Sequence, residues 1–397
     1  MVKVGEEFVR TEVQFIPAKL KVIDHYRETY ECRSCRKNGT PYMEKAPVPY
    51  PPVLHSLASA STITWLIHQK FELSIPLYRQ EKEWEALGLR LSRATMSNWL
   101  LVVYRDWLVH IVHRLKLELL KQRYLHIDET HVQVLKEPGR KNTSDSYMWV
   151  YCSIRDAVNP IRYFEYQPGR SGKYPEAFLR EYEGYIHTDA YSGYNAVSGV
   201  KRCLCYTHLR RAFVDALPKD IHNSEASKPA EAILRLNQFF NIESELEALP
   251  PDQKKKERLI REKPLLEAFW SWAEKSAIGE LPKSKLSKAF HYALNNREGF
   301  WNYLEDGNCS ISNSLAENCI RPFVIGRKNW LFSGSPKGAE ASAGIYTLVE
   351  TAKANGLAPM KYIKYILSDM PGSAFLEHPE YLDDYLPWNP LVKEFCR

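Results

Sequence analysis

The sequence lacks long hydrophobic runs: no stretch of its 397 residues approaches the roughly 18 consecutive apolar residues of a membrane-spanning helix. Its first residues, Met1 to Glu7, lack the basic-then-apolar pattern of a secretory signal. Cysteine is sparse, and most of the eight cysteines lie in apolar runs, which favours reduced thiols in a cytosol. We therefore expect a cytoplasmic protein without a membrane partner.

Charge is distributed unevenly along the chain, whose formal net charge is +6 at pH 7. The first 125 residues carry 19 lysines and arginines against 13 acidic residues, whereas the remainder carries 35 of each. Within that remainder, residues 309–364 hold seven basic residues against three acidic ones. The basic N-terminal part and the second basic segment, residues 309–364, favour a polyanionic partner.

The pattern of the sequence divides the chain into six segments. At about 150 residues per domain, a chain of this length is expected to hold several domains. The clearest boundary is the stiff, proline-rich linker Pro47–Pro52. The segments are a cysteine-containing N-terminal part with this linker (1–52), a helical domain (53–123), the first part of an α/β core (124–218), a helical insertion (219–308), the second part of the core (309–366) and an acidic tail (367–397).

The helical domain contains a predicted helix-turn-helix. One helix ends at Gly88, a short turn follows, and Ser92 is placed to cap the next helix. Met96 and Trp99 then face the core, and the exposed face carries the candidate DNA-binding residues Arg93, Thr95 and Asn98. Arginine and asparagine are suited to guanine and adenine edges. The alternative is a plain helical hairpin with a solvated polar face.

From Tyr124 the periodicity becomes that of strands. The predicted order is three strands, a helix, two further strands and a helix, which is typical of a mixed sheet with flanking helices. Residues 219–308 are helix-like, without a strand signal. The predicted elements are strands at 124–128, 147–154, 161–166, 184–189 and 201–206, with helices at 174–182 and 209–217.

Two aspartates, Asp128 and Asp189, each end a short apolar strand. On neighbouring parallel strands the two carboxylates would lie close together, and a cation between them would relieve their repulsion. Mg²⁺ suits oxygen ligands, and two such ions about 3.5–4 Å apart stabilise an in-line phosphoryl displacement. The alternative is that each strand simply leaves the sheet at a polar residue.

Glu317 has the spacing of a capping box with Ser314, so its role could be limited to the first turn of a helix. If it faces the two aspartates, it becomes a third metal ligand. Arg321 lies four residues later on the same helical face, where it could contact a phosphate or pair with Glu317. Pro322 is expected to end or kink this helix.

Several blocks of the sequence resemble bacterial transposases of insertion-sequence family sixty-six. The similarity runs in order from about residue 8 to 366. The blocks are Pro76–Glu81, Leu125–Thr130, Thr188–Asn195, Ser312–Glu317, Ile320–Phe332 and Gly344–Leu357. One position departs from the family pattern: of the two consecutive asparagines that usually precede the glutamate block, the second is Ser314 here.

The resemblance implies an Asp-Asp-Glu transposase with a ribonuclease-H-like core that a helical insertion interrupts. Asp128, Asp189 and Glu317 would be the catalytic triad that binds Mg²⁺ or Mn²⁺. Water would attack a phosphodiester at the end of the element, and the freed 3′-hydroxyl would then attack target DNA. The implied partners are double-stranded terminal inverted repeats, target DNA, further copies of the chain and accessory proteins of the same element, in a nucleoid-associated complex of the bacterial cytoplasm.

Further basic residues are candidate phosphate contacts. The pair Arg210 and Arg211 follows a Cys205-x-x-His208 motif that also matches the family. That motif supplies only two of the four ligands of a structural zinc site, so packing is the favoured role, with support of the catalytic site as the alternative. The other basic candidates are Arg321, Arg327 and Lys328.

Cys32 and Cys35 form a Cys-x-x-Cys pair, which is half of a four-ligand zinc site. In the resembled family a second such pair lies upstream, but no cysteine precedes Cys32 here. Two interpretations stay open: the upstream half is missing from this polypeptide, or His25 and another group replace it.

Two other functions compete with a transposase. One is a catalytically silent DNA-binding remnant of a transposase, and the other is a ribonuclease-H-like nuclease that acts on other structures. The intact triad favours an enzyme, whereas the absent upstream cysteines favour the remnant.

Overall fold

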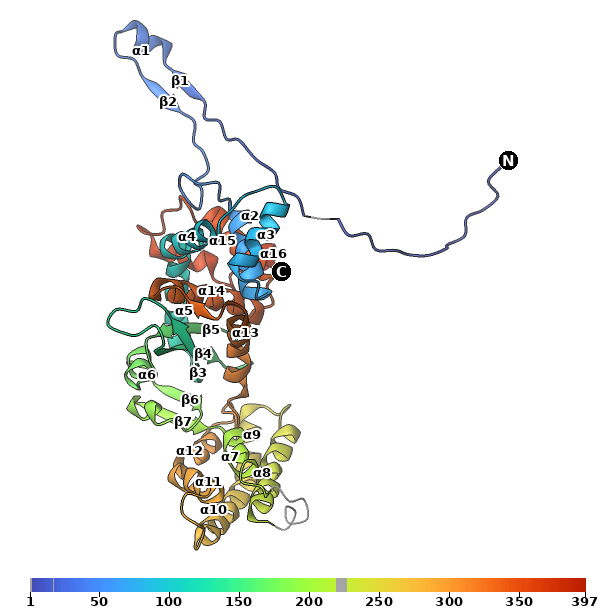
Figure 1. The fold of residues 1–397 in the computed structure, drawn as a ribbon, viewed down its shortest axis with the longest axis vertical. Helices are drawn as coiled ribbons and strands as arrows, with labels where there is room; N and C mark the ends of the chain where they lie inside the picture. Colours follow the sequence, from blue (N-terminus) through green and yellow to red (C-terminus); the bar gives the residue numbers. More distant parts are fainter. Residues whose placement is uncertain (1, 17, 219–226) are drawn as a thin grey trace.

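The computed structural model describes residues 2–16, 18–218 and 227–397. The described part is elongated (Figure 1): a hairpin projects from one end, a helical layer follows, a sheet lies in the middle, and a second group of helices forms the other end. The first eight residues of the predicted insertion lie outside the described residues. No helix of the described part is long and apolar enough to cross a membrane.

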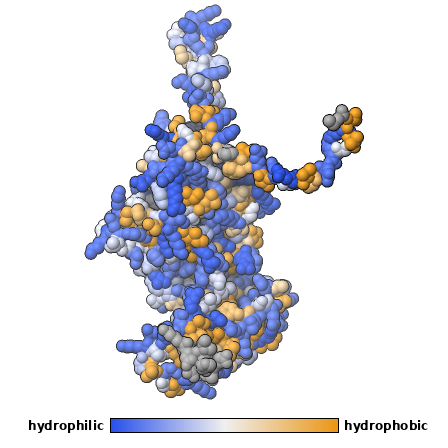
Figure 2. Space-filling view, turned by 45° about the vertical axis from the view of Figure 1, so that its right-hand side comes forward, coloured by the Kyte–Doolittle hydropathy of each residue, from blue (hydrophilic) through white to orange (hydrophobic). Residues whose placement is uncertain are grey.

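The N-terminal segment runs as an extended chain to a small hairpin. Strands β1 (Thr29–Glu31) and β2 (Met43–Lys45) pair antiparallel, and the short helix α1 (Arg33–Lys37) lies between them. The space-filling view shows this hairpin as a largely hydrophilic projection beyond the body of the molecule (Figure 2).

The structure contains the two predicted helices and the turn between them, which fits both a DNA-binding helix-turn-helix and a plain helical hairpin. Gly88 follows the first helix with a φ of +89°, a left-handed conformation that glycine adopts without strain. The Ser92 hydroxyl accepts a hydrogen bond from the Thr95 amide at 3.1 Å, as a cap of the second helix does. Met96 and Trp99 are buried, as predicted. The helices of this region are α2 (Ala60–Ile67), α3 (Leu77–Ala86), α4 (Arg93–Val103) and α5 (Val109–Leu120), with π-helical turns at His68–Glu72 and Tyr104–Leu108.

A six-stranded mixed sheet forms the middle of the protein, with the strand order β5-β4-β3-β6-β7 and β8 beside β3. The predicted succession of strands and helices is confirmed. β4 is antiparallel to both β3 and β5, whereas β6 is parallel to both β3 and β7. The elements are β3 (Tyr124–Val134), β4 (Asp145–Ser153), β5 (Arg162–Gln167), α6 (Lys173–Phe178), β6 (Gly184–Thr188), β7 (Val200–Leu204), α7 (Tyr206–Val214) and β8 (Phe332–Ser333).

Helix α14 (Pro336–Ala354) covers the outer edge of the sheet at β5. Its Thr347 hydroxyl accepts from the Phe164 amide at 2.8 Å, and its Thr351 hydroxyl accepts from the Arg162 amide at 3.0 Å. An uncovered edge strand exposes a row of such amides and invites pairing with other chains. The two threonines therefore satisfy part of this edge within the chain itself.

The predicted insertion is helical throughout residues 227–308, and the structure places no strand in that range. Its apolar residues form a second core together with β7 and α7, separate from the core around β3–β5. The helices are α8 (Lys228–Glu245), α9 (Pro251–Arg261), α10 (Lys263–Ala277), α11 (Lys285–Asn295) and α12 (Arg297–Trp301), with a 3₁₀ turn at Asn302–Glu305.

The C-terminal residues, assigned to an acidic tail from the sequence, form helices and turns that pack on the rest of the protein. Helix α15 (Pro359–Asp369), a 3₁₀ turn (Pro379–Tyr385) and α16 (Pro390–Cys396) pack on the helices of residues 53–123. This segment packs on the protein despite its acidic surface because its apolar side chains are buried in the first core. They are Phe375, Tyr385, Leu386, Val392 and Cys396.

Candidate active site

The two predicted aspartates follow equivalent positions of two parallel strands. The register pairs His126 of β3 with His187 of β6, and each aspartate lies two residues further along, at Asp128 and Asp189. β6 ends there, and β8 joins β3 only from Gln133 onward. Asp128 therefore lies in a gap between two partner strands, where the edge of β3 is open to side chains.

Asn313 ties the third acidic residue to this edge. It is buried directly before helix α13 (Ser314–Trp330), and its side-chain amide donates to the Ile127 carbonyl at 2.8 Å. Its amide oxygen lies 3.0 Å from His126 Nδ1. Because Ile127 precedes Asp128, this network fixes the start of α13, and with it Glu317, against the strand that carries Asp128.

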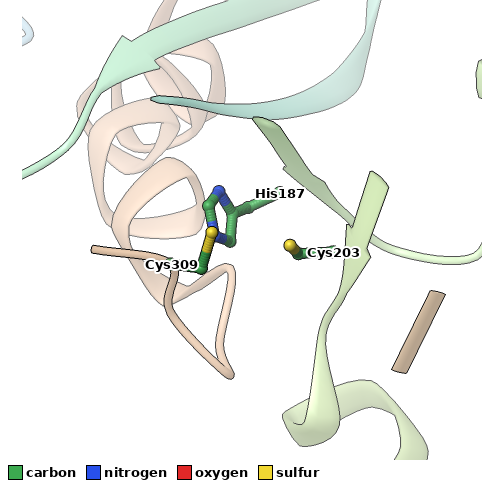
Figure 3. Close-up of side chains that lie close together, drawn as sticks. All are labelled: His187, Cys203 and Cys309. Carbon is green, nitrogen blue, oxygen red and sulfur yellow. The ribbon is translucent and has the colours of Figure 1, made fainter. Parts of the chain in front are cut away.

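His187, two residues before Asp189, connects β6 to β3 and to the segment before α13. Its Nδ1 lies 3.1 Å from the Leu125 carbonyl, its Nε2 accepts from the Ser310 amide at 2.9 Å, and its ring stacks on His126 with centroids 4.2 Å apart. Figure 3 shows the Cys309 sulfur beside this ring and Cys203 on the neighbouring strand. The segment that leads into α13 is thus held by buried hydrogen bonds, which are costly to leave unmade.

The electrostatics of the site centre on Asp128. Burial raises the pKa of its carboxyl from 3.8 to about 7, and the negative charges of Glu129, Asp189 and Glu317 add to the shift. These acids therefore lie near enough to Asp128 to disfavour its ionised form. A bound cation would reverse this penalty.

This raised pKa predicts a pH-dependent stability. Between about pH 4 and pH 7 the folded protein keeps a proton on Asp128 that the unfolded chain has released, so stability falls as pH rises. Without divalent cations, Asp128→Asn is therefore expected to be more stable than the wild type at pH 8, by on the order of 2–4 kcal/mol. The difference should vanish near pH 4, and urea unfolding in EDTA at both pH values measures it. An equal difference at both pH values would contradict the assignment.

The structure adds two residues that the sequence analysis did not select. Arg170, in the loop after β5, pairs with Glu129 at 2.6 Å and lies 3.9 Å from Asp189. The Glu129 side chain is nearly inaccessible and also accepts a hydrogen bond from Tyr194. Glu129 could have been selected from the sequence because it is adjacent to Asp128. No sequence pattern near Arg170 indicates that it belongs to the site.

Arg202 of β7 secures the loop that carries Asp189. Its guanidinium donates to the carbonyls of Asp189 and Tyr191 at 2.6 and 2.8 Å, and to the hydroxyl of Thr188 at 2.7 Å. The Tyr191 amide in turn donates to the Asp189 carboxylate at 2.9 Å. One partly buried cation thus orders the backbone on both sides of the second predicted catalytic residue.

Glu317 points toward His208 of α7, with its Oε1 3.7 Å from His208 Nδ1. Hydrogen bonding with Cys205, together with the charges of Glu317 and Asp189, raises the pKa of His208. Burial alone would raise the pKa of Cys205, but His208 and the Asn313 amide, 3.1 Å from the sulfur, lower it. In the described residues, Asp128, Asp189 and Glu317 do not form a group whose oxygens all lie within 4.8 Å.

One expectation for α13 needs correction, and one of the two alternatives for Pro322 is excluded. Ser314 does not cap the helix with its side chain; it is the first helical residue, Asn313 occupies the cap position, and Glu317 is free of the capping-box role. Pro322 does not end the helix, which continues to Trp330. A proline removes the hydrogen bond to the carbonyl four residues earlier, and here that residue, Asn318, is exposed, so water can replace the bond.

Comparison with known proteins identifies the family. The model described as "Transposase IS66 family" matches residues 55–341, which is well over half of the chain. The chain belongs to the IS66 family of transposases. A second model, the zinc-finger binding domain of transposase IS66, matches residues 1–36.

Similar curated proteins come from Sinorhizobium fredii. Uncharacterized protein y4hP is 26% identical over 407 residues, covering 97% of this chain and 71% of the relative. Uncharacterized protein y4qI is 27% identical over 412 residues, covering 98% and 72%. The similarity to these relatives covers nearly the whole chain.

The predicted DNA-binding residues of this transposase differ in the exposure of their side chains and in whether they have partners within the protein. In the second helix of the helix-turn-helix, Arg93 and Asn98 are exposed and Thr95 is partly exposed. The exposed candidates elsewhere are Arg211, Arg321 and Lys328. For all of these, contact with DNA stays a prediction.

Two arginines have partners within the transposase. Arg327 donates to the Thr130 hydroxyl at 3.0 Å and to the His131 carbonyl, which lies in the gap of the β3 ladder. Arg210 donates to Asn237 of the insertion at 2.7 Å. Both guanidiniums therefore join distant elements of the fold, a use that the sequence pattern does not reveal.

The IS66 zinc-finger match includes the pair Cys32 and Cys35, which flanks the start of α1. Hydrogen bonds from Cys35 and Ser34 lower the pKa of Cys32. This chemistry is consistent with a zinc ligand, since zinc binds thiolates. His25 does not join the pair: no third candidate ligand lies within 4.8 Å of both sulfurs in the described residues.

Proposed function

We propose that this transposase moves an insertion sequence by metal-dependent phosphodiester hydrolysis and strand transfer at the terminal inverted repeats of the element. The observation that supports the proposal is that Asp128 and Asp189 lie at equivalent positions of two parallel strands, while the charges of Asp189 and Glu317 both help to raise the pKa of Asp128. We further propose that the sheet, interrupted by the insertion, is a ribonuclease-H-like core.

The donors at this edge fit a hard divalent cation such as Mg²⁺ or Mn²⁺. Three carboxylates offer oxygen ligands, and ionised Asp128 carries a penalty that a cation would remove. The Glu317 Oε1 atom is buried without a hydrogen-bond partner in the described residues. Asp128, Asp189 and Glu317 would hold the cation, which supplies charge neutralisation at the attacked phosphate when bound.

The contribution of the protein's own residues is to position these carboxylates. Asn313 and His126 hold α13 against β3, and Arg202 holds the loop of Asp189. Arg170 keeps Glu129 paired, so that this acid adds less repulsion to the site. Preorganised charge of this kind is the main requirement of phosphoryl transfer, in which water and then the 3′-hydroxyl of the element are the nucleophiles.

We propose that Arg93, Thr95 and Asn98 contact the ends of the element. The β1–α1–β2 hairpin, which carries Cys32 and Cys35, would contribute to the same DNA binding. Two ends must be joined in one reaction, so the active complex would contain at least two copies of the chain. Accessory proteins of the same element and a nucleoid-associated place in the cytoplasm belong to the same proposal.

The test uses purified full-length protein, Mg²⁺ or Mn²⁺, and labelled DNA that carries the inverted repeats flanking its gene. We expect nicks at the ends of the repeats, with a free 3′-hydroxyl, and no nicks when the repeat is scrambled. Binding without nicking under both metals would instead identify a catalytically silent remnant. Cutting that ignores the repeat sequence would identify a nuclease of another kind.

A further inference from the structure

Cys205, His208 and Glu317 form a compact group whose candidate ligand atoms all lie within 4.8 Å of one another. Cys205 directly precedes α7, and His208 lies in the first turn of that helix. Glu317 comes from the first turn of α13, so the group joins the start of two helices that are about 100 residues apart in sequence.

Two of the three ligand atoms have no hydrogen-bond partner outside the group itself in the described residues. These are His208 Nδ1 and Glu317 Oε1, both inaccessible to solvent and separated by 3.7 Å, which is too long for a hydrogen bond. A buried polar atom without a partner costs about 1–3 kcal/mol, so such atoms are rare without a bound water or ion. Here two atoms without a partner outside the group face each other beside the sulfur of Cys205, which is the hydrogen-bond partner of His208.

A second group in the described residues consists of His187, Cys203 and Cys309 (Figure 3), and its histidine has no unengaged ring nitrogen. Both nitrogens of His187 are already engaged, with the Leu125 carbonyl and the Ser310 amide. All three side chains are buried, so an ion would have to break the network that holds the loop before α13. This group therefore serves as a matched control for the first one.

We propose that Cys205, His208 and Glu317 bind one zinc-like transition-metal ion. Sulfur, nitrogen and carboxylate oxygen are the donors that Zn²⁺ takes, and two ligand atoms at about 2.1 Å from a tetrahedral ion lie about 3.4 Å apart. The 3.7 Å between His208 Nδ1 and Glu317 Oε1 is close to that spacing. With three protein ligands, the fourth position is left to water.

This site differs from the magnesium site of the proposed function in its chemistry and shares one residue with it. Mg²⁺ prefers oxygen ligands alone, so the sulfur and imidazole select a softer ion. Only the statement that Glu317 is shared rests on the proposed function. The metal binding itself is measured without DNA, so it succeeds or fails independently of any cleavage activity.

The experiment titrates the full-length Cys32→Ser/Cys35→Ser variant with CoCl₂ and records its absorption. We expect one equivalent of cobalt with the visible bands of a tetrahedral site and a near-ultraviolet thiolate charge-transfer band, both removed by ZnCl₂. Cys205→Ser should remove the charge-transfer band. His208→Ala should weaken binding at least about tenfold, a loss that even outer-shell changes cause.

The control is Cys309→Ser in the same background, which should keep both bands and the affinity. His208 is partly exposed, so His208→Ala carries the test if Cys205→Ser does not fold, as judged by circular dichroism. No cobalt bands in the parent variant would overturn the proposal, as would bands that persist in both site variants. Bands that disappear only in Cys309→Ser would assign the metal to the control group instead.

Discussion

Asp128→Asn is expected to abolish cleavage at the ends of the inverted repeats, with the rate falling by on the order of 10²–10³-fold or more. The side chain keeps its size and can still accept the hydrogen bond that the Glu129 amide donates at 2.9 Å. It loses the negative charge that binds a divalent cation, and charge that acts in the transition state affects the rate more than DNA binding. The measurement is the single-turnover nicking rate with saturating Mg²⁺ or Mn²⁺, together with the affinity for the uncut repeat.

The matched control is Asp156→Asn, which makes the same chemical change in the exposed turn between β4 and β5. We expect it to cleave at the wild-type rate. Asp189→Asn and Glu317→Gln should be as inactive as Asp128→Asn, since a shared site fails when any ligand is lost. Wild-type cleavage by Asp128→Asn would remove this residue from the catalytic site.

Arg258→Ala is expected to destabilise the protein by about 3–5 kcal/mol, because it breaks a buried ion pair from one side. Arg258 of α9 is fully buried and forms two hydrogen bonds with Glu243, at 2.6 and 2.7 Å. Its remaining donors contact the carbonyls of Tyr303, Asp306 and Cys309 at 2.8–3.2 Å. Without the arginine, Glu243 would keep only Lys254, at 3.4 Å, near the buried Glu262, whose pKa burial and Glu243 already raise to about 7.

Chemical unfolding measures this loss, and Arg261→Ala is the control on the same helix. Arg261 pairs with Glu245 at the surface, where an ion pair contributes about 0–1 kcal/mol. Arg258 also holds the carbonyl of Cys309, shortly before Asn313, so nicking by Arg258→Ala should fall even where the protein remains folded. Similar stabilities for the two variants would show that the insertion does not depend on Arg258.

The candidate site shows which parts of a fold short-range signals predict. Gly88 and Ser92 mark the turn between two helices because backbone conformation and capping depend on a few neighbouring residues. The strands and helices of residues 124–218 follow in the predicted order for the same reason. The placement of Asp128 and Asp189 on neighbouring strands was predictable because each follows a short apolar strand. The parallel register of β3 and β6 then brings the two equivalent positions together.

The sequence is less informative where the contacting residues are distant in sequence. The segment 367–397 is acidic, but its buried apolar residues find partners on the helices of residues 53–123. Pro322 lies within α13 without ending it, and the helix packs against β3 and β4. In both cases tertiary contacts decided the structure, rather than the local preferences of the acidic segment and of proline.

The amino-acid sequence alone determined the family and the order of strands and helices, because each depends on neighbouring residues or on matching blocks of sequence. It also selected the three acidic residues that we propose as the catalytic site. Only the tertiary structure decided that Arg170 pairs with Glu129, that Arg327 fills the gap in β3, and that Glu317 faces His208 and Cys205. These contacts join residues 41 to 197 positions apart. Such pairs form only when several elements pack at once, so no local pattern records them.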